Sequence, residues 1–120
     1  MYVRRRIRVY AAGDVLRVEA FGLAALPSGK VYQAWIIQPS GKQVPKPPSR
    51  EFLRFVLDGF RSVDGGLVTP VAFFVPDVNG DATISVPSGQ PKGSLLAFTI
   101  EPTGGSQAPT AKPSVAAMFP

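Results

Sequence analysis

The stretch VYQAWII at residues 31–37 decides the fold class of this 120-residue chain. It consists mainly of β-branched, aromatic and other apolar residues, which favour strands. Its apolar side chains fall on both faces of an extended chain, so it predicts a central strand that is covered from both sides. The turn sequence LPSGK at 26–30 leads directly into it.

Two alternating runs at the N-terminus predict a hairpin. In residues 2–10, apolar side chains share one face, and the other face carries Arg4, Arg6 and Arg8. A turn at 11–14 separates this run from a second one at 15–21. Glu19 then becomes available as a cross-strand partner for one of the arginines.

The second half of the chain holds further strand and turn signals. A run at 67–75 is interrupted by Pro70, which predicts an edge strand or a bulge because proline has no N–H to donate. Asn79-Gly80 predicts a type I′ hairpin turn, since both residue types tolerate a positive φ, and 82–86 is the expected partner strand.

Two more runs, at 94–101 and 114–119, bring the expected number of strands to about seven. Their spacing predicts a single all-β domain over 1–120, a two-sheet antiparallel sandwich of the immunoglobulin-like, Greek-key kind. A closed barrel is the alternative.

The segment 38–67 does not fit this regular spacing. Residues 38–49 contain four prolines and two lysines, which suits a loop. In 51–60, Phe52, Phe55 and Phe60 fit the stripe of a short helix, and they also suit an irregular strand.

Composition limits the chemistry. The chain has no cysteine and no histidine, which removes thiol nucleophiles, Cys/His zinc sites and Ser-His-Asp triads. The eight acidic residues show no paired arrangement, so we expect neither an enzyme nor a cofactor. No apolar run is long enough to cross a membrane, and the basic N-terminus has no apolar segment of a signal peptide.

Two local patterns suggest binding, each beside a simpler interpretation. Asp77, Asn79 and Asp81 alternate like the start of a calcium loop, but the glycine and the closing glutamate of an EF-hand are misplaced, so a plain hairpin is favoured. The arginine row could meet an anionic surface, and much of the net charge of +5 lies there. Few aromatic residues accompany it, so we expect no nucleic acid and favour a solvated strand face.

Two stretches, LPSGKVYQAWII at 26–37 and AFTIEPTGGSQAPT at 97–110, resemble motifs of the C-terminal extracytoplasmic domain of anti-sigma-K factors. The residues that carry this resemblance are Tyr32, Trp35, Glu101, Pro102, Gly104, Gly105, Pro109 and Thr110.

We expect these residues to be structural. Trp35 would anchor the core of the sandwich, and Tyr32 would pack on the other face with its hydroxyl bonded. The Glu101 carboxylate would accept backbone N–H bonds from the loop that follows it.

The resemblance implies an extracytoplasmic regulatory domain of a membrane-anchored protein, which controls release of a sigma factor through contacts with a protein partner or protease. The sigma factor would be bound only by a cytoplasmic part that this sequence lacks, as it lacks the family's membrane helix. The segment 43–67 is longer than the segment that usually links the tryptophan-containing strand to the next strand in this family, so it is interpreted as an insertion. The N-terminal arginines fit less well, because basic residues are disfavoured just outside a membrane helix.

Two other functions remain open. A free-standing cell-wall or carbohydrate-binding module would use the arginine face or the phenylalanines of the insertion. An oligomerising structural domain would bury Phe52, Phe55 and Phe60 on a second copy of the chain.

Overall fold

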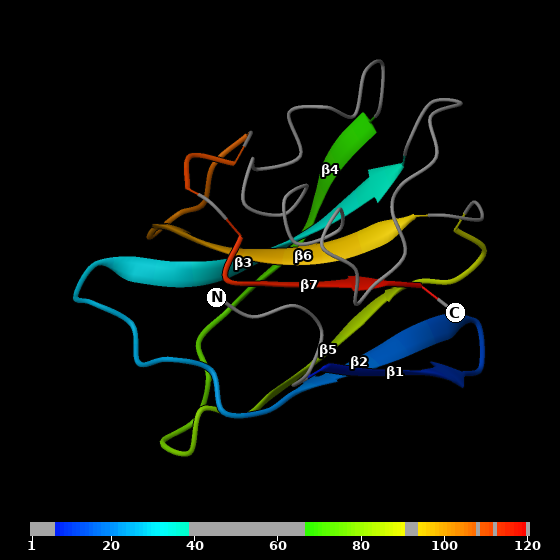
Figure 1. Ribbon diagram of the computed structural model, residues 1–120, viewed down its shortest axis with the longest axis horizontal. Helices are drawn as coiled ribbons and strands as arrows, with labels where there is room; N and C mark the ends of the chain where they lie inside the picture. The colour runs from blue at the N-terminus through cyan, green and yellow to red at the C-terminus, as the bar shows by residue number, and fades with distance from the viewer. Residues whose placement is uncertain (1–6, 39–66, 91–93, 108, 112, 120) are drawn as a thin grey trace, which may run out of the picture.

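A computed structural model describes residues 7–38, 67–90, 94–107, 109–111 and 113–119. They form two antiparallel sheets that face each other, which confirms the predicted all-β, two-sheet sandwich (Figure 1). The strands are β1 (Ile7–Ala12), β2 (Val15–Ala20), β3 (Lys30–Gln38), β4 (Leu67–Phe74), β5 (Ala82–Pro87), β6 (Leu95–Pro102) and β7 (Val115–Met118). No helix suited to crossing a membrane occurs in these ranges.

The strand order is that of a Greek key. The smaller sheet has the order β1-β2-β5, and the larger sheet has the order β4-β3-β6-β7. Strands that follow one another in the chain therefore often belong to different sheets, as in immunoglobulin-like sandwiches. The chain passes from one sheet to the other between β2 and β3, between β4 and β5, and between β5 and β6.

The N-terminal hairpin forms as predicted, and the predicted turn at 11–14 narrows to Gly13 and Asp14, because Ala11 and Ala12 belong to β1. Gly13 has a φ of +72°, which a residue without a Cβ adopts at little cost. Arg8 lies opposite Glu19 across the hairpin, and its Nε is 3.6 Å from Glu19 Oε1. The predicted cross-strand pair is thereby confirmed.

Strand β3 is the centre of the larger sheet. It pairs with β4 on one side and β6 on the other, and residues 32–37 are buried. On the β4 side the register shifts between Ala34 and Trp35, whose partners are Ala72 and Pro70. Val71 is therefore an extra residue beside Pro70, so the bulge and the edge position predicted for this strand are both observed.

The core lies between the sheets. From the larger sheet Tyr32, Ala34 and Phe98 point into it, and from the smaller sheet Val18 and Val86 do so. Tyr32 donates a hydrogen bond of 2.8 Å from its hydroxyl to the Ala24 carbonyl, so its one polar atom is satisfied. This arrangement gives Tyr32 the central place in the sandwich core.

The prediction for Trp35 is wrong in one respect. Trp35 is fully buried, but it does not belong to the cluster between the sheets. Side chains alternate along a strand, so with Tyr32 and Ala34 pointing inward Trp35 points to the outer face of the larger sheet. Because β3 is apolar on both faces, the sequence pattern does not show which face is which.

The predicted Asn79-Gly80 hairpin is also corrected. The Gly80 N–H donates to the Asp77 carbonyl at 2.9 Å, so Val78 and Asn79 are the central residues of the turn. The strands on either side of it, β4 and β5, belong to different sheets. A local turn signal shows that the chain reverses, but it does not show which strand the next segment pairs with.

The turn instead joins the connection between β4 and β5 to the connection between β2 and β3. Leu23 donates its N–H to the Gly80 carbonyl at 2.8 Å, and Gly80, at a φ of +82°, is buried against this backbone. A Cβ at Gly80 would lie 2.5 Å from the carbonyl oxygen of Leu23.

Several sequence predictions fall on residues outside the described ranges. These are the first part of the N-terminal run, the insertion up to residue 66, and the helix or strand at 51–60.

Replacing Gly80 with alanine should destabilise the domain more than the same change at Gly13. At both positions alanine must adopt a positive φ, at a cost of about 1–2 kcal/mol. At Gly80 the new methyl group also meets backbone, which should add about 1–3 kcal/mol, whereas nothing lies within 4 Å at Gly13. Urea denaturation of both variants measures the difference, and equal losses would contradict the close packing at Gly80.

Candidate functional site: the Glu101 network

The two motifs, far apart in the sequence, meet on the outer face of the larger sheet. Strand β3 pairs with β6 so that Gln33 lies opposite Thr99 and Val31 lies opposite Glu101. On this face Gln33, Trp35, Thr99 and Glu101 are all 0% exposed. Buried polar side chains need hydrogen-bond partners, and the structure supplies them from the loop that follows β6.

The Glu101 carboxylate is the centre of this network. It accepts hydrogen bonds from the hydroxyls of Thr99 at 2.5 Å, Ser106 at 2.8 Å and Thr110 at 2.5 Å. The Thr110 backbone N–H donates to it as well, at 3.1 Å. Thr110 thus provides the loop N–H that the sequence led us to expect. We call the loop that supplies these donors, residues 103–107 and 109–110, the motif loop.

These hydrogen bonds determine the charge state of Glu101. Desolvation by burial raises its pKa, but the hydrogen bonds from Thr110, Thr99 and Ser106 outweigh this effect and leave the pKa below its ordinary value. Glu101 is therefore a carboxylate at neutral pH. The donors that the described part of the chain supplies are all neutral, so there hydroxyl and peptide dipoles stabilise the charge.

Two further contacts extend the network along β3. Trp35 donates from its indole Nε1 to the Thr99 hydroxyl at 2.8 Å, and the Thr99 hydroxyl in turn donates to the Glu101 carboxylate. Gln33 donates from its side-chain amide to the Ser106 carbonyl and accepts from the Ser106 N–H, both at 2.9 Å. The Gln33 side chain thereby pairs with the loop backbone as a neighbouring strand would.

The glycines of the second motif allow the motif loop to approach the sheet. Gly105 has a φ of +81°, and its N–H closes a turn onto the Pro102 carbonyl at 2.8 Å. A Cβ at Gly105 would lie 2.3 Å from the ring of Phe73 on β4. Thr103 also donates its N–H to the Gly29 carbonyl at 2.9 Å, which joins the loop to the turn of the first motif.

The network holds the motif loop against the outer face of the larger sheet. The carboxylate is buried and all its contacts are made within the protein, so it does not face solvent or an open cavity. Its chemistry is that of a structural anion that holds a loop against a sheet. Among the other motif residues, Pro102 ends β6 opposite Lys30, and Pro109 is half-buried next to Thr110.

The residues proposed as an interaction surface are only partly described. Of the arginine row, Arg8 lies within the described ranges, exposed on β1 with its guanidinium 5.3 Å from the centre of the Tyr10 ring. Arg4 and Arg6 lie outside those ranges, as do the phenylalanines of the insertion.

The residues of the calcium hypothesis shape the turn between β4 and β5. Asp77 accepts the N–H groups of Asn79 at 2.9 Å and Asp81 at 3.0 Å through one carboxylate oxygen. Asp81 accepts the N–H of Gly22 at 3.2 Å. Within the described part of the chain, no three acidic, histidine or cysteine residues gather in a way that could hold a metal ion.

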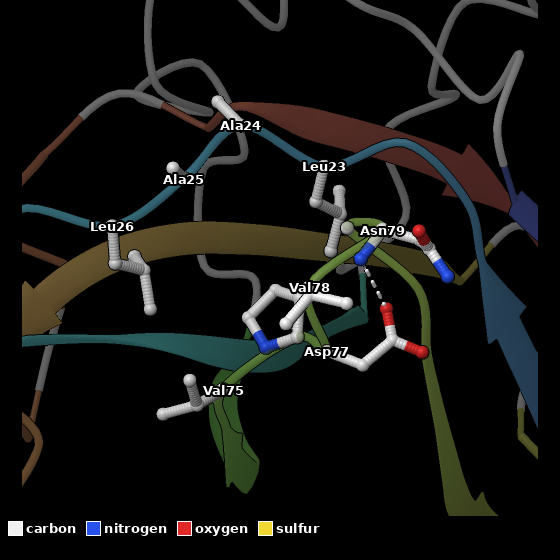
Figure 2. A pocket seen from close by; sticks show the side chains of 10 residues that line it. Leu23, Ala24, Ala25, Leu26, Val75, Asp77, Val78 and Asn79 are labelled. Atoms are coloured by element: carbon white, nitrogen blue, oxygen red, sulfur yellow. Dashed lines mark hydrogen bonds between the residues drawn. The ribbon is translucent and has the colours of Figure 1, made fainter.

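This turn also borders a groove that the sequence did not predict. A groove of about 320 Å³ lies between residues 23–26 and 75–80. Figure 2 shows Leu23 and Leu26 pointing toward the facing segment, which carries Val75 and, in the turn itself, Val78. The Val78 side chain is fully exposed and Val75 is 66% exposed, so the rim carries two exposed apolar side chains beside the polar residues Asp77 and Asn79. The two segments that line this groove are far apart in the sequence, so no sequence pattern predicts that they meet.

The sequence analysis did not predict the hydroxyl groups that donate to Glu101. Thr99 interrupts an apolar strand with a hydroxyl, which is the available signal of a buried hydrogen bond. Ser106 carries no such signal, because loops are generally polar.

No protein-family model, curated protein or solved structure matches this chain.

Replacing Glu101 with glutamine should make the domain less stable at neutral pH, by about 1–3 kcal/mol, because an amide cannot accept from all four donors. A lowered pKa means that Glu101 stabilises the fold above its ordinary pKa of 4.5, and that this contribution is lost as the pH falls through the lower folded-state pKa. The difference in free energy of unfolding between the wild type and Glu101→Gln should therefore become smaller as the pH falls below 4.5.

Urea denaturation at a series of pH values from neutral to strongly acidic tests this. Glu19→Gln is the matched control, since it removes the same charge from a partly exposed pair on the other sheet and should have a small effect. A gap between the wild type and Glu101→Gln that does not change with pH would show that the charge of Glu101 is not what stabilises the loop.

Proposed function

We propose that this chain is an extracytoplasmic regulatory domain of an anti-sigma-factor-like, membrane-anchored protein. It acts through contacts with a protein partner or protease in the pathway that releases a sigma factor. The observation that supports the proposal is that the two motifs resembling this family are the segments that the Glu101 network joins. The motifs therefore form one structural unit of this domain.

The network suggests how such a domain would regulate proteolysis. A protease cuts an extended segment, so the rate of cleavage follows how often that segment opens. The motif loop is held by Gln33 and Glu101 together, so opening it breaks several hydrogen bonds at once. A partner that binds the folded domain would lower the opening frequency further, by mass action.

The apolar groove supports a protein as the partner. Its rim presents Val75 and Val78 to solvent, and exposed apolar side chains beside a concave surface are typical of protein contacts. The groove lies at the inter-sheet connections, away from the Glu101 network.

A chimera tests the proposed function. The extracytoplasmic domain of a known anti-sigma-K factor is replaced by this chain, and transcription of a sigma-dependent reporter is measured in its host. The chimera should keep the reporter repressed. Glu101→Ala in the chimera should raise reporter output, because the opened loop exposes the domain to proteolysis.

The matched control is a chimera that carries an unrelated immunoglobulin-like sandwich of similar stability. If that chimera represses the reporter as well, and responds to destabilisation in the same way, the regulatory role does not belong to this domain and the proposal fails. The amount of each chimera in the membrane fraction is measured alongside.

A further inference from the structure

The sequence contains a single asparagine, Asn79, and Gly80 follows it directly. Asn79 is exposed at the turn between β4 and β5. An asparagine side-chain amide can be attacked by the backbone nitrogen of the next residue, and glycine obstructs this attack least because it has no Cβ. Asparagine is accordingly one of the thermolabile residues of proteins. The turn therefore contains a side chain that can change covalently without an enzyme.

The closed turn holds the Gly80 nitrogen away from this reaction. Gly80 donates its N–H to the Asp77 carbonyl at 2.9 Å, and its own carbonyl accepts the N–H of Leu23 at 2.8 Å. The Asn79 N–H donates to the Asp77 carboxylate at 2.9 Å (Figure 2). The attack requires a Gly80 nitrogen that has lost its proton and lies against the Asn79 side chain, so the peptide between them has to rotate. Gly80 is buried against the backbone of Leu23, which prevents this rotation while the turn is closed.

We propose that Asn79 is a modification site controlled by this turn: it loses its amide when the turn opens, and the product prevents the turn from closing again. The Gly80 nitrogen gives up its proton and forms a bond to Cγ of Asn79, the bond from Cγ to Nδ2 breaks, and the amide takes up a proton and leaves as ammonia. Water then opens the resulting cyclic imide to aspartate or to isoaspartate. In isoaspartate the main chain runs through the former side chain and is longer by one methylene group. Water is the only co-reactant.

The longer chain does not fit the closed turn. Gly80 already packs so tightly that a Cβ placed on it would lie 2.5 Å from the carbonyl oxygen and 2.8 Å from the nitrogen of Leu23. Adding a methylene group ahead of Gly80 moves this residue, and the Leu23 N–H then loses its acceptor. Leu23 is 8% exposed and belongs to the core, so one end of the core loosens. The modification makes a normally transient opening permanent, and this inference does not depend on the proposed regulatory function.

The first test compares the reaction in the native and the unfolded state. The purified chain is incubated at mildly alkaline pH, with and without denaturing urea, and ion-exchange chromatography follows the product that has gained a negative charge. The wild type should react at least about tenfold more slowly when folded, because the rate follows how often the turn opens. Asn79→Ser should form no such product in either state, which identifies Asn79 as the source.

Asp77→Ala tests whether the turn controls the rate. It removes the acceptor of the Asn79 and Asp81 N–H groups, so the native-state rate should rise about tenfold. In urea, its rate should equal that of the wild type, because the turn is absent there. Asp14→Ala is the matched control, since it removes an exposed carboxylate from the turn between β1 and β2 and should change the native-state rate by less than about threefold. If Asp77→Ala does not fold, the wild type is measured in urea below its unfolding transition, where its rate should rise with the urea concentration.

The second test measures what the product does to the fold. The isoaspartate form is isolated by chromatography and identified by peptide mapping, and its unfolding in urea is compared with that of Asn79→Asp. The two proteins carry the same charge, but only the isoaspartate form has the longer main chain. The isoaspartate form should therefore unfold at a lower urea concentration.

Each of three results would contradict the proposal. Equal rates in the folded and the unfolded wild type would show that the turn does not protect Asn79. A native-state rate that rises equally in Asp77→Ala and Asp14→Ala would remove the role of the Asp77 hydrogen bonds. An isoaspartate form as stable as Asn79→Asp would show that the turn closes again around the longer chain.

Discussion

The buried carboxylate of Glu101 is the constraint on which the outer face of the larger sheet depends. An ionised group removed from water is costly unless every acceptor position is filled. Here Thr99 fills one position from the same strand, and Ser106 and Thr110 fill the others from the motif loop. The loop therefore has to lie against the sheet wherever the carboxylate is buried, and the path of the chain after β6 follows from this one group.

Strand β3 is buried on both of its faces between Tyr32 and Ile37. One face of the strand, with Tyr32 and Ala34, forms the core between the sheets. The other face, with Gln33 and Trp35, is equally buried on the outer side of the larger sheet. A two-sheet sandwich normally leaves such outer faces to solvent. In this domain, the larger sheet is instead the middle of a structure that is packed on both sides.

The strands were predictable from the sequence because alternation and turn residues are local signals. The pairing of Arg8 with Glu19 and the bulge at Pro70 followed from the same rules. The sequence did not predict which face of the larger sheet Trp35 lies on, because a strand that is buried on both faces shows no alternation that would orient it. The candidate site was predictable only in part. Glu101 and its loop were recognisable, whereas the fit of Gln33 onto the Ser106 peptide depends on two segments meeting in space.

The strand order has a consequence for how this domain forms on the ribosome. Strands β1 and β2 emerge first and make a hairpin, but their sheet lacks its third strand until residue 87 has been synthesised. The larger sheet waits longer, because β3 pairs with β6 and the Glu101 network closes only with Thr110. Strand β3 can pair with β4 once residue 74 has emerged, but its other edge has no partner until β6 has been synthesised. An unpaired apolar strand edge on a nascent chain favours aggregation, so the order of synthesis leaves this domain most exposed to it before β6 is complete.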